Sequence, residues 1–272
     1  MAIITISRGS FSKGKEVAQG VAQNLGYQCI SREILLEASQ HFNIPEIKLE
    51  RALHDAPSVL ERFTYGKERY MAYIAEAFLE RVQGNNVVYH GLAGQFFLRG
   101  VSHVLKARVL ADLEDRVALE MEREHLGREE ALARLRKDDQ ERRRWSQHLF
   151  GVDTWDPALY DLVLHVHKLN VANTVDIICQ TAQLEQFQAT PQSQRALDNL
   201  LLAARVKASL VHDFPMVQVH AQDGVVIVDA KFNQTVEPEL AERIKALARQ
   251  TPGVREVRMH AEPVSAYACQ PD

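Results

Sequence analysis

Short apolar runs alternate with helical patterns over the first two thirds of the chain. Runs rich in β-branched residues predict buried strands at residues 1–6, 27–30, 86–90, 103–110 and 162–166. Between the first two, apolar residues recur at helical spacing, as in Val17, Val21 and Leu25 ahead of Gly26. Strands that alternate with helices imply right-handed crossovers, so this pattern predicts an α/β fold with a mainly parallel sheet covered on both faces.

The pattern changes after a closing helix predicted at residues 171–187. Residues 188–194 have neither charge nor apolar periodicity, and we interpret them as a linker. Beyond them the chain predicts helix, strand, strand, helix and strand, at 196–211, 217–221, 225–230, 238–250 and 254–260. Asp223-Gly224 between two alternating runs is a strong hairpin signal. We therefore expect two domains with separate cores, at 1–187 and 195–262, joined by the linker 188–194 and followed by a tail at 263–272.

The composition is that of an ordinary globular protein. Of the 272 residues, 46% are hydrophobic and 25% are charged, which excludes wholesale disorder. The net charge of −4 creates no positive field, so we expect no nucleic-acid partner. The three cysteines form no C-x-x-C pair, and no apolar run is long enough for a signal peptide or a membrane span. These features predict reduced thiols, a cytoplasmic location and no membrane-spanning segment.

Residues 9–15 satisfy the phosphate-loop pattern G-x-x-x-x-G-K between a predicted buried strand and a helix. In that position backbone N–H groups and the helix N-terminus face the phosphates, and Lys15 adds a charge to the β and γ oxygens. The predicted nucleotide-binding residues are Gly9, Ser10, Phe11, Ser12, Lys13, Gly14, Lys15 and Glu16. A loop that merely uses two glycines to turn is the weaker interpretation. Glu16 stands where a magnesium-binding Ser or Thr is expected, which leaves Ser10, Ser12 or a water on Glu16 for that role.

The residues around this loop resemble the cytidylate-kinase-like family of P-loop nucleotide kinases. Residues 6–8, 12 and 14–17, and then Leu25-Gly26, match the opening of that family, in which Glu at position 16 is usual. Phe11 and Lys13 replace family glycines. The resemblance covers most of residues 1–186 and implies a nucleoside-monophosphate-kinase-like sheet with a helical lid, using ATP, Mg²⁺ and a nucleotide acceptor.

The segment after the third predicted strand departs from the family pattern. Leu92 stands where the family has an arginine, and His90 stands where cytidylate kinases have an acidic residue. Leucine offers no donor to a phosphate, so either other residues hold the acceptor phosphate or the acceptor site has been lost.

Residues 112–149 are almost uninterrupted helix formers, and basic residues are dense at 127–144. The resemblance identifies this segment as a mobile lid, in which Asp139 and Arg142 match a D-K-x-R signature. It implies three catalytic residues: Lys15, Arg142 on the transferring group, and Asp139, which orients Arg142 or contacts the acceptor. The alternative is a solvated helix with i,i+4 ion pairs.

Two histidines and the C-terminal segment complete the sequence predictions. His165 and His167 share one face of the fifth strand, but without a third ligand nearby we predict no metal site. Residues 197–261 resemble a BON domain, a small αββαβ module, through turn and core residues that carry no chemistry. That resemblance implies binding of a partner, a small ligand or a membrane surface, so peripheral membrane contact stays open.

The sequence as a whole favours an ATP-dependent nucleotide kinase with a C-terminal ligand- or partner-binding module. The alternative is a nucleotide-binding regulator that no longer turns over and signals through the BON-like domain. Phe11, His90, Leu92 and the missing hydroxyl at position 16 favour that alternative.

Overall fold

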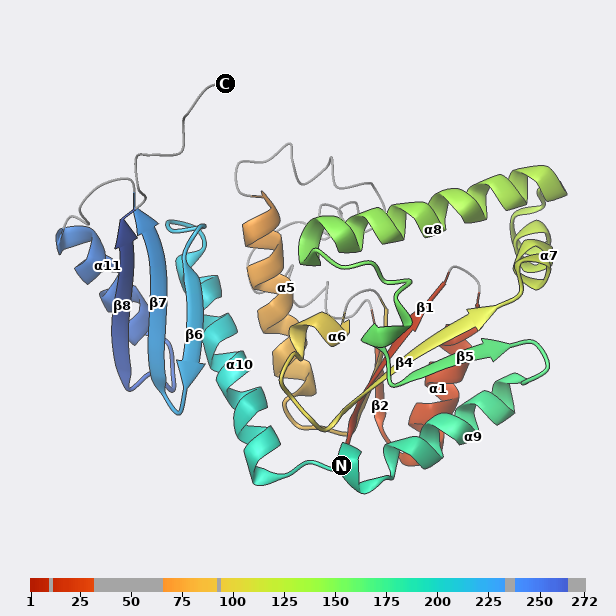
Figure 1. Cartoon of the computed structure of the whole chain (residues 1–272), viewed down its shortest axis with the longest axis horizontal. Helices are drawn as coiled ribbons and strands as arrows, with labels where there is room; N and C mark the ends of the chain where they lie inside the picture. The colour runs from red at the N-terminus through yellow and green to blue at the C-terminus, as the bar shows by residue number, and fades with distance from the viewer. Residues whose placement is uncertain (10–11, 32–65, 92–93, 233–237, 264–272) are drawn as a thin grey trace.

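The computed structural model describes residues 1–9, 12–31, 66–91, 94–232 and 238–263 (Figure 1). The predictions for Ser10, Phe11 and Leu92 lie outside these residues. None of the helices in the described part of the chain has the length and apolar content that crossing a bilayer requires.

A five-stranded parallel sheet organises the first part of the chain. Its strands are β1 (Ile3–Arg8), β2 (Gln28–Ile30), β3 (Val87–His90), β4 (Val104–Ala111) and β5 (Leu162–Val166), in the order β2-β3-β1-β4-β5. In the central strand, Ile4 pairs with Val88 on one side and Leu105 on the other. The five predicted strands are confirmed, because parallel strands buried on both faces are nearly continuous apolar runs.

Helices cover both faces of this sheet (Figure 1). On one face, α1 (Gly14–Leu25) and α9 (Val171–Ala182) form a core with the strands, to which Ile4, Val21 and Ile178 contribute fully buried side chains. On the other face, α5 (Gly66–Val82) and the short α6 (Gly94–Phe97) pack around Phe78. The 3-10 helix η2 (Glu185–Phe187) follows α9.

The helix formers at residues 112–149 are arranged in two helices, α7 (Leu113–Glu124) and α8 (Arg128–Phe150). His125 interrupts them because it takes a left-handed conformation with φ 56°, and its N–H bonds to the carbonyl of Met121. Figure 1 shows α8 running across the molecule from α7 towards α5. The 3-10 helix η1 (Pro157–Leu159) then leads into β5.

The C-terminal part of the chain has its own three-stranded sheet. It contains α10 (Pro191–Leu210), β6 (Gln218–Gln222), β7 (Val225–Phe232), α11 (Pro238–Arg249) and β8 (Glu256–Pro263). β6 pairs antiparallel with β7, and β7 pairs parallel with β8. The predicted hairpin turn is confirmed, since Asp223 and Gly224 have φ values of 47° and 81° and Gln222 pairs with Val225.

The linker predicted at residues 188–194 needs correction, because its last four residues form the first turn of α10. The Thr190 side chain accepts a hydrogen bond from the Ser193 N–H at 3.1 Å, and the Ser193 hydroxyl accepts one from the Thr190 N–H at 2.9 Å. Pro191 occupies the first helical position, where its missing N–H costs nothing. Most of the uncharged tract 188–194 therefore belongs to the N-terminus of α10 and its cap.

α10 contributes to two hydrophobic cores. Leu197, Leu201 and Ala204 are buried in the core around α5, whereas Val206 and Leu210 are buried with β6 and β7. Between the cores, Arg205 pairs with Glu80 of α5 at 2.9 Å. The two cores therefore share α10, and the domain bounds 1–187 and 195–262 stay predictions.

Candidate functional site

The phosphate loop joins the end of β1 to the start of α1. Ser12 is buried, and its hydroxyl donates to the carbonyl of Gly9 at 3.1 Å. Lys13 precedes the helix in a left-handed conformation, φ 59°. The Arg8 side chain packs over Gly14, where an added Cβ would lie 2.7 Å from the Arg8 Cβ. Position 14 therefore excludes any side chain while Arg8 lies there.

A cavity of about 580 Å³ lies at the carboxyl ends of β1, β4 and β5, beside α7 and α8. Such an edge is where ligands bind in open α/β sheets. Its polar and charged lining comprises Ser7, Arg8, Arg108, Arg116, Arg136, Asp139, Arg142, Thr154 and His165. The remaining lining residues are Gly9, Leu110, Ala111, Leu113, Trp155, Pro157 and Val163.

The cavity carries an excess of positive charge, because Asp139 is the single acidic residue among the described residues of its lining, which include five arginines. Burial, and next the neighbouring guanidinium of Arg142, lowers the pKa of Arg8. Burial also lowers the pKa of Arg142, although Asp139 and Asp138 oppose the shift. Buried Arg8 Nε and Arg108 Nη1 have no hydrogen-bond partner in the described part of the chain. Donors left unsatisfied in this way are suited to a bound anion.

The helices α7 and α8 bring Asp139 and Arg142 close to the phosphate loop. Arg116 on α7 donates from Nη2 to Oδ2 of Asp139 on α8 at 2.7 Å. The same guanidinium lies beside Gly9, with Cζ 3.7 Å from where a Cβ would stand. The structure thus gathers three predicted site residues, Gly9, Asp139 and Arg142, around one cavity.

The other described members of the predicted site lie around the loop and the first turn of α1. Ser12 and Gly14 are buried, whereas Lys13, Lys15 and Glu16 are exposed. The residues that line the cavity do not include Lys15. Its assignment to the phosphates stays a prediction.

Four cavity arginines are not among the site residues predicted from the sequence: Arg8, Arg108, Arg116 and Arg136. Arg108 lies within β4, and Arg116 lies in the first turn of α7, far along the chain from the phosphate loop. A usable signal for Arg108 is its place inside a mostly apolar strand, whose other charged residue is Lys106, since strands of a parallel sheet seldom carry charges. For Arg116 the chain offers no comparable signal, because charged residues surround it on the helix surface.

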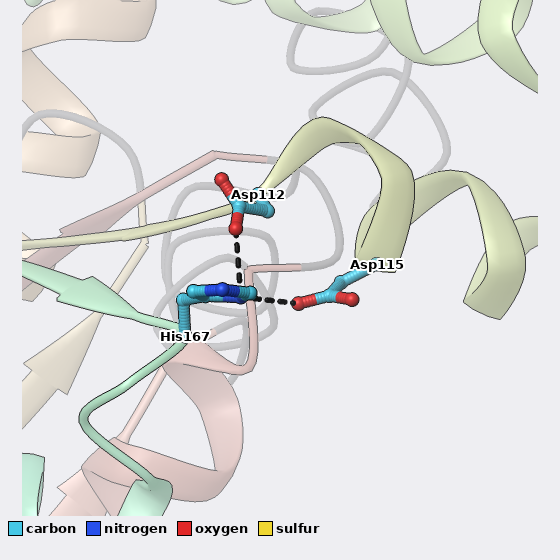
Figure 2. A group of neighbouring side chains, drawn as sticks. All are labelled: Asp112, Asp115 and His167. Carbon is cyan, nitrogen blue, oxygen red and sulfur yellow. Dashed lines mark hydrogen bonds and ion pairs between the residues drawn. The ribbon is translucent and has the colours of Figure 1, made fainter.

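A cluster of nitrogen and oxygen atoms lies beside the cavity at the ends of β4 and β5 (Figure 2). His167 Nδ1 is 2.7 Å from Asp112 Oδ2 and 3.4 Å from Asp115 Oδ2. His165 Nε2 is 3.3 Å from Asp112 Oδ1. The sequence pattern offers two histidines without a third ligand. In the structure, Asp112 and Asp115 at the start of α7 bring carboxylate groups next to His167. These contacts are also ordinary hydrogen bonds between accessible side chains, and the absence of a metal there stays a prediction.

Comparison with known proteins adds a family and a fold. Residues 3–168 match the model of the cytidylate kinase-like family. No curated protein sequence is significantly similar to the chain. A crystal structure of an uncharacterized protein from Eubacterium ventriosum is similar with a TM-score of 0.51 and 22% identity, covering 67% of this chain and 98% of that one. TT1252 from Thermus thermophilus has a TM-score of 0.44 and 19% identity, and the match covers 67% of this chain and 97% of that one. Shikimate kinase from Bacteroides thetaiotaomicron has a TM-score of 0.42 and 9% identity, and the match covers 67% of this chain and 99% of that one.

Proposed function

The chain belongs to the cytidylate kinase-like family, and we propose that it transfers the γ-phosphoryl group of ATP to a nucleotide acceptor. The arginine-lined cavity next to the phosphate loop carries this proposal. Phosphoryl transfer spreads negative charge over three equatorial oxygens, and guanidinium groups stabilise that charge most when they are held out of water. Arg8 and Arg142 meet this condition, since burial lowers the pKa of both.

The donor set fits the phosphates of ATP better than a metal ion alone. Arg8 Nε and Arg108 Nη1 are buried donors without partners in the described residues. Mg²⁺ usually binds one or two carboxylates together with substrate phosphates and water. Among the described residues, Asp139 and the Ser12 hydroxyl offer oxygen atoms near Gly9. Bound MgATP supplies the phosphoryl group and the charge that the arginines neutralise.

Five of the predicted site residues have a task in this proposal. The backbone of Gly9 and Gly14 forms the cradle of the loop, and Lys15 provides a point charge for the β- and γ-phosphates. Arg142 stabilises the transferring group. Asp139 holds Arg116 at 2.7 Å and lies close enough to act on the charge of Arg142. The lid thereby positions two guanidinium groups through one carboxylate.

The test is a panel of nucleoside mono- and diphosphates incubated with ATP and Mg²⁺, with the products separated by chromatography. One acceptor is expected to be converted, and the Lys15→Ala variant is expected to bind ATP more weakly because a full charge is lost from a site of backbone dipoles. Gln19→Ala, an exposed position on the same helix, is the matched control. Unchanged ATP affinity in Lys15→Ala by calorimetry would contradict the placement of the phosphates.

A second function, a nucleotide-binding regulator without turnover, is favoured by one described departure from the family, the buried His90 at an acidic position. Tight ATP binding with no product from any acceptor would favour it. In either case we propose that the module formed by α10, β6, β7, α11 and β8 binds a partner or small ligand, as its resemblance to a BON domain implies.

A further inference from the structure

One wall of the arginine-lined cavity is apolar and aromatic. Trp155 is 55% exposed and Val163 is 44% exposed, and both line the cavity together with Pro157. Exposed apolar side chains that are grouped on the wall of a polar cavity mark a ligand-binding surface. This wall therefore calls for an occupant with an apolar surface.

Trp155 is held in place by polar contacts. The guanidinium of Arg143 lies 4.9 Å from the centre of the Trp155 ring and donates from Nε to Oδ1 of Asp153 at 2.9 Å. The backbone N–H of Trp155 donates to the same Asp153 oxygen at 3.0 Å. Arg143 is not part of the cavity lining, so its contact leaves another part of the ring facing the cavity. A ring fixed in this way loses little conformational entropy when a ligand stacks on it.

The loop that carries Trp155 is also tied to the phosphate-loop strand. The Tyr160 hydroxyl lies 3.0 Å from the Thr154 carbonyl, to which it donates, and 3.2 Å from the hydroxyl of Ser7 in β1. Arg108 lies 5.5 Å from the Tyr160 ring and pairs in register with Val163 across β4 and β5. The apolar wall and the arginine with a buried donor atom are thus connected through Tyr160 and through the pairing of β4 with β5.

We infer that Trp155, with Pro157 and Val163, forms a stacking surface for the base of a nucleoside phosphate whose phosphate binds Arg108. The inference rests on the proposed function and names the part of the site that recognises the base. A planar base can stack on the apolar wall while its phosphate binds Arg108. A phosphate ester without an aromatic ring can bind the arginines but cannot stack on the wall. The cation–π contact of Arg143 holds the Trp155 ring in place for such a stack.

The experiment measures binding of CMP, UMP, AMP, GMP, ATP, ribose 5-phosphate and tripolyphosphate to the full chain by calorimetry. Trp155→Ala is expected to weaken at least one base-containing ligand by roughly fivefold to a hundredfold, the range for loss of one base–aromatic stack. Ribose 5-phosphate and tripolyphosphate are expected to change less than twofold. Trp155→Phe keeps a ring and is expected to retain most of the affinity. Met216→Ala, which removes another exposed apolar side chain in the C-terminal part, is the matched control.

The outcomes separate this inference from the proposed function. Nucleotide binding that Trp155→Ala leaves unchanged would overturn the stacking surface alone. Equal losses for ribose 5-phosphate and for the nucleotides would also overturn it, because a general disturbance of the cavity would then explain both. If the wild-type chain binds no nucleotide at all, the proposed function fails together with the inference.

Discussion

Arg116 and Asp139 lie 23 residues apart in sequence, yet a hydrogen bond of 2.7 Å joins their side chains beside Gly9 of the phosphate loop. Both side chains are largely shielded from water, with 11% and 20% of their surface exposed. The pair fixes α7 against α8 and supplies the single negative charge in the lining of an otherwise cationic cavity. Its partial burial means that solvent and salt screen it less than a surface ion pair.

Asp139→Asn is expected to tighten tripolyphosphate binding by a few-fold to about tenfold, since one competing negative charge leaves the cavity. Turnover is expected to fall, because Arg142 loses the carboxylate beside it. Calorimetry at low and high salt measures the first effect, which added salt should reduce. Glu130→Gln makes the same charge change at an exposed position of α8. Equal tightening in both variants would show a general charge effect.

Arg142→Ala separates catalysis from binding. If the guanidinium acts mainly as charge develops in the transition state, kcat is expected to drop about a hundredfold while the ATP dissociation constant changes only a few-fold. Steady-state kinetics and calorimetry give the two numbers. The neighbouring Arg144 is exposed and provides the control substitution to alanine. Equal losses in kcat and affinity would identify a ground-state contact instead.

Lys13 takes a backbone conformation that favours glycine, with φ 59°. The left-handed region costs an ordinary residue roughly 1 kcal/mol. Lys13→Gly is therefore expected to raise the free energy of unfolding by up to about 1 kcal/mol in a denaturant titration. Gln19→Gly, at an exposed position inside α1, is expected to lower it by a similar amount. Destabilisation by Lys13→Gly would mean that the lysine side chain makes a compensating contact.

Glu76 on α5 predicts a pH dependence of stability. Burial, followed by the charge of Glu80 and opposed by Arg205, raises the pKa of Glu76 from 4.5 to about 7. A raised pKa in the folded state means that its favourable contribution is complete below pH 4.5 and is lost as the pH rises through about 7. Glu76→Gln is expected to gain about 1–3 kcal/mol over the wild type at pH 8 and little at pH 5. Urea titrations at both pH values test this, and an equal gain at both would contradict it.

The sequence revealed the strands and the phosphate loop because each has a local signal. β1 is a continuous apolar run, and the two glycines and the lysine of the loop lie at fixed offsets from it. The hairpin at Asp223 was visible for the same reason, since a type I′ turn demands residues that tolerate positive φ.

The rest of the site depended on side chains that meet only in the folded chain. Arg108 and Tyr160 lie 52 residues apart, and Asp112 reaches His167 across neighbouring strands. No spacing rule in the sequence links such pairs. The start of α10 was hidden for another reason. In the capping box of α10, Thr190 is the N-cap and Ser193 occupies the position that usually holds Glu or Gln. Without that Glu or Gln, the pattern of this polar tract predicts a linker.

The position of α10 predicts how the two parts of the chain depend on each other. Leu201 is 1% exposed in the core around α5, and removing its side chain is expected to cost about 2–5 kcal/mol. Leu184→Ala, at a leucine that is 51% exposed, is expected to cost less than 1 kcal/mol. Denaturant titration of both variants compares them directly.

The same helix decides the outcome of proteolysis near residues 188–194. A protease needs an extended segment, but Thr190 caps a helix that starts at Pro191, and Ser193 is hydrogen-bonded to the fully buried His103 at 2.7 Å. We expect cleavage there to be slow, and a chain starting at Arg195 to be unstable because it exposes Leu197 and Leu201 to water. Limited proteolysis with mass spectrometry, and circular dichroism of the shortened chain, measure both. A stable fragment and rapid cutting would show that α10 can leave the α5 core, and that the two parts are independent domains.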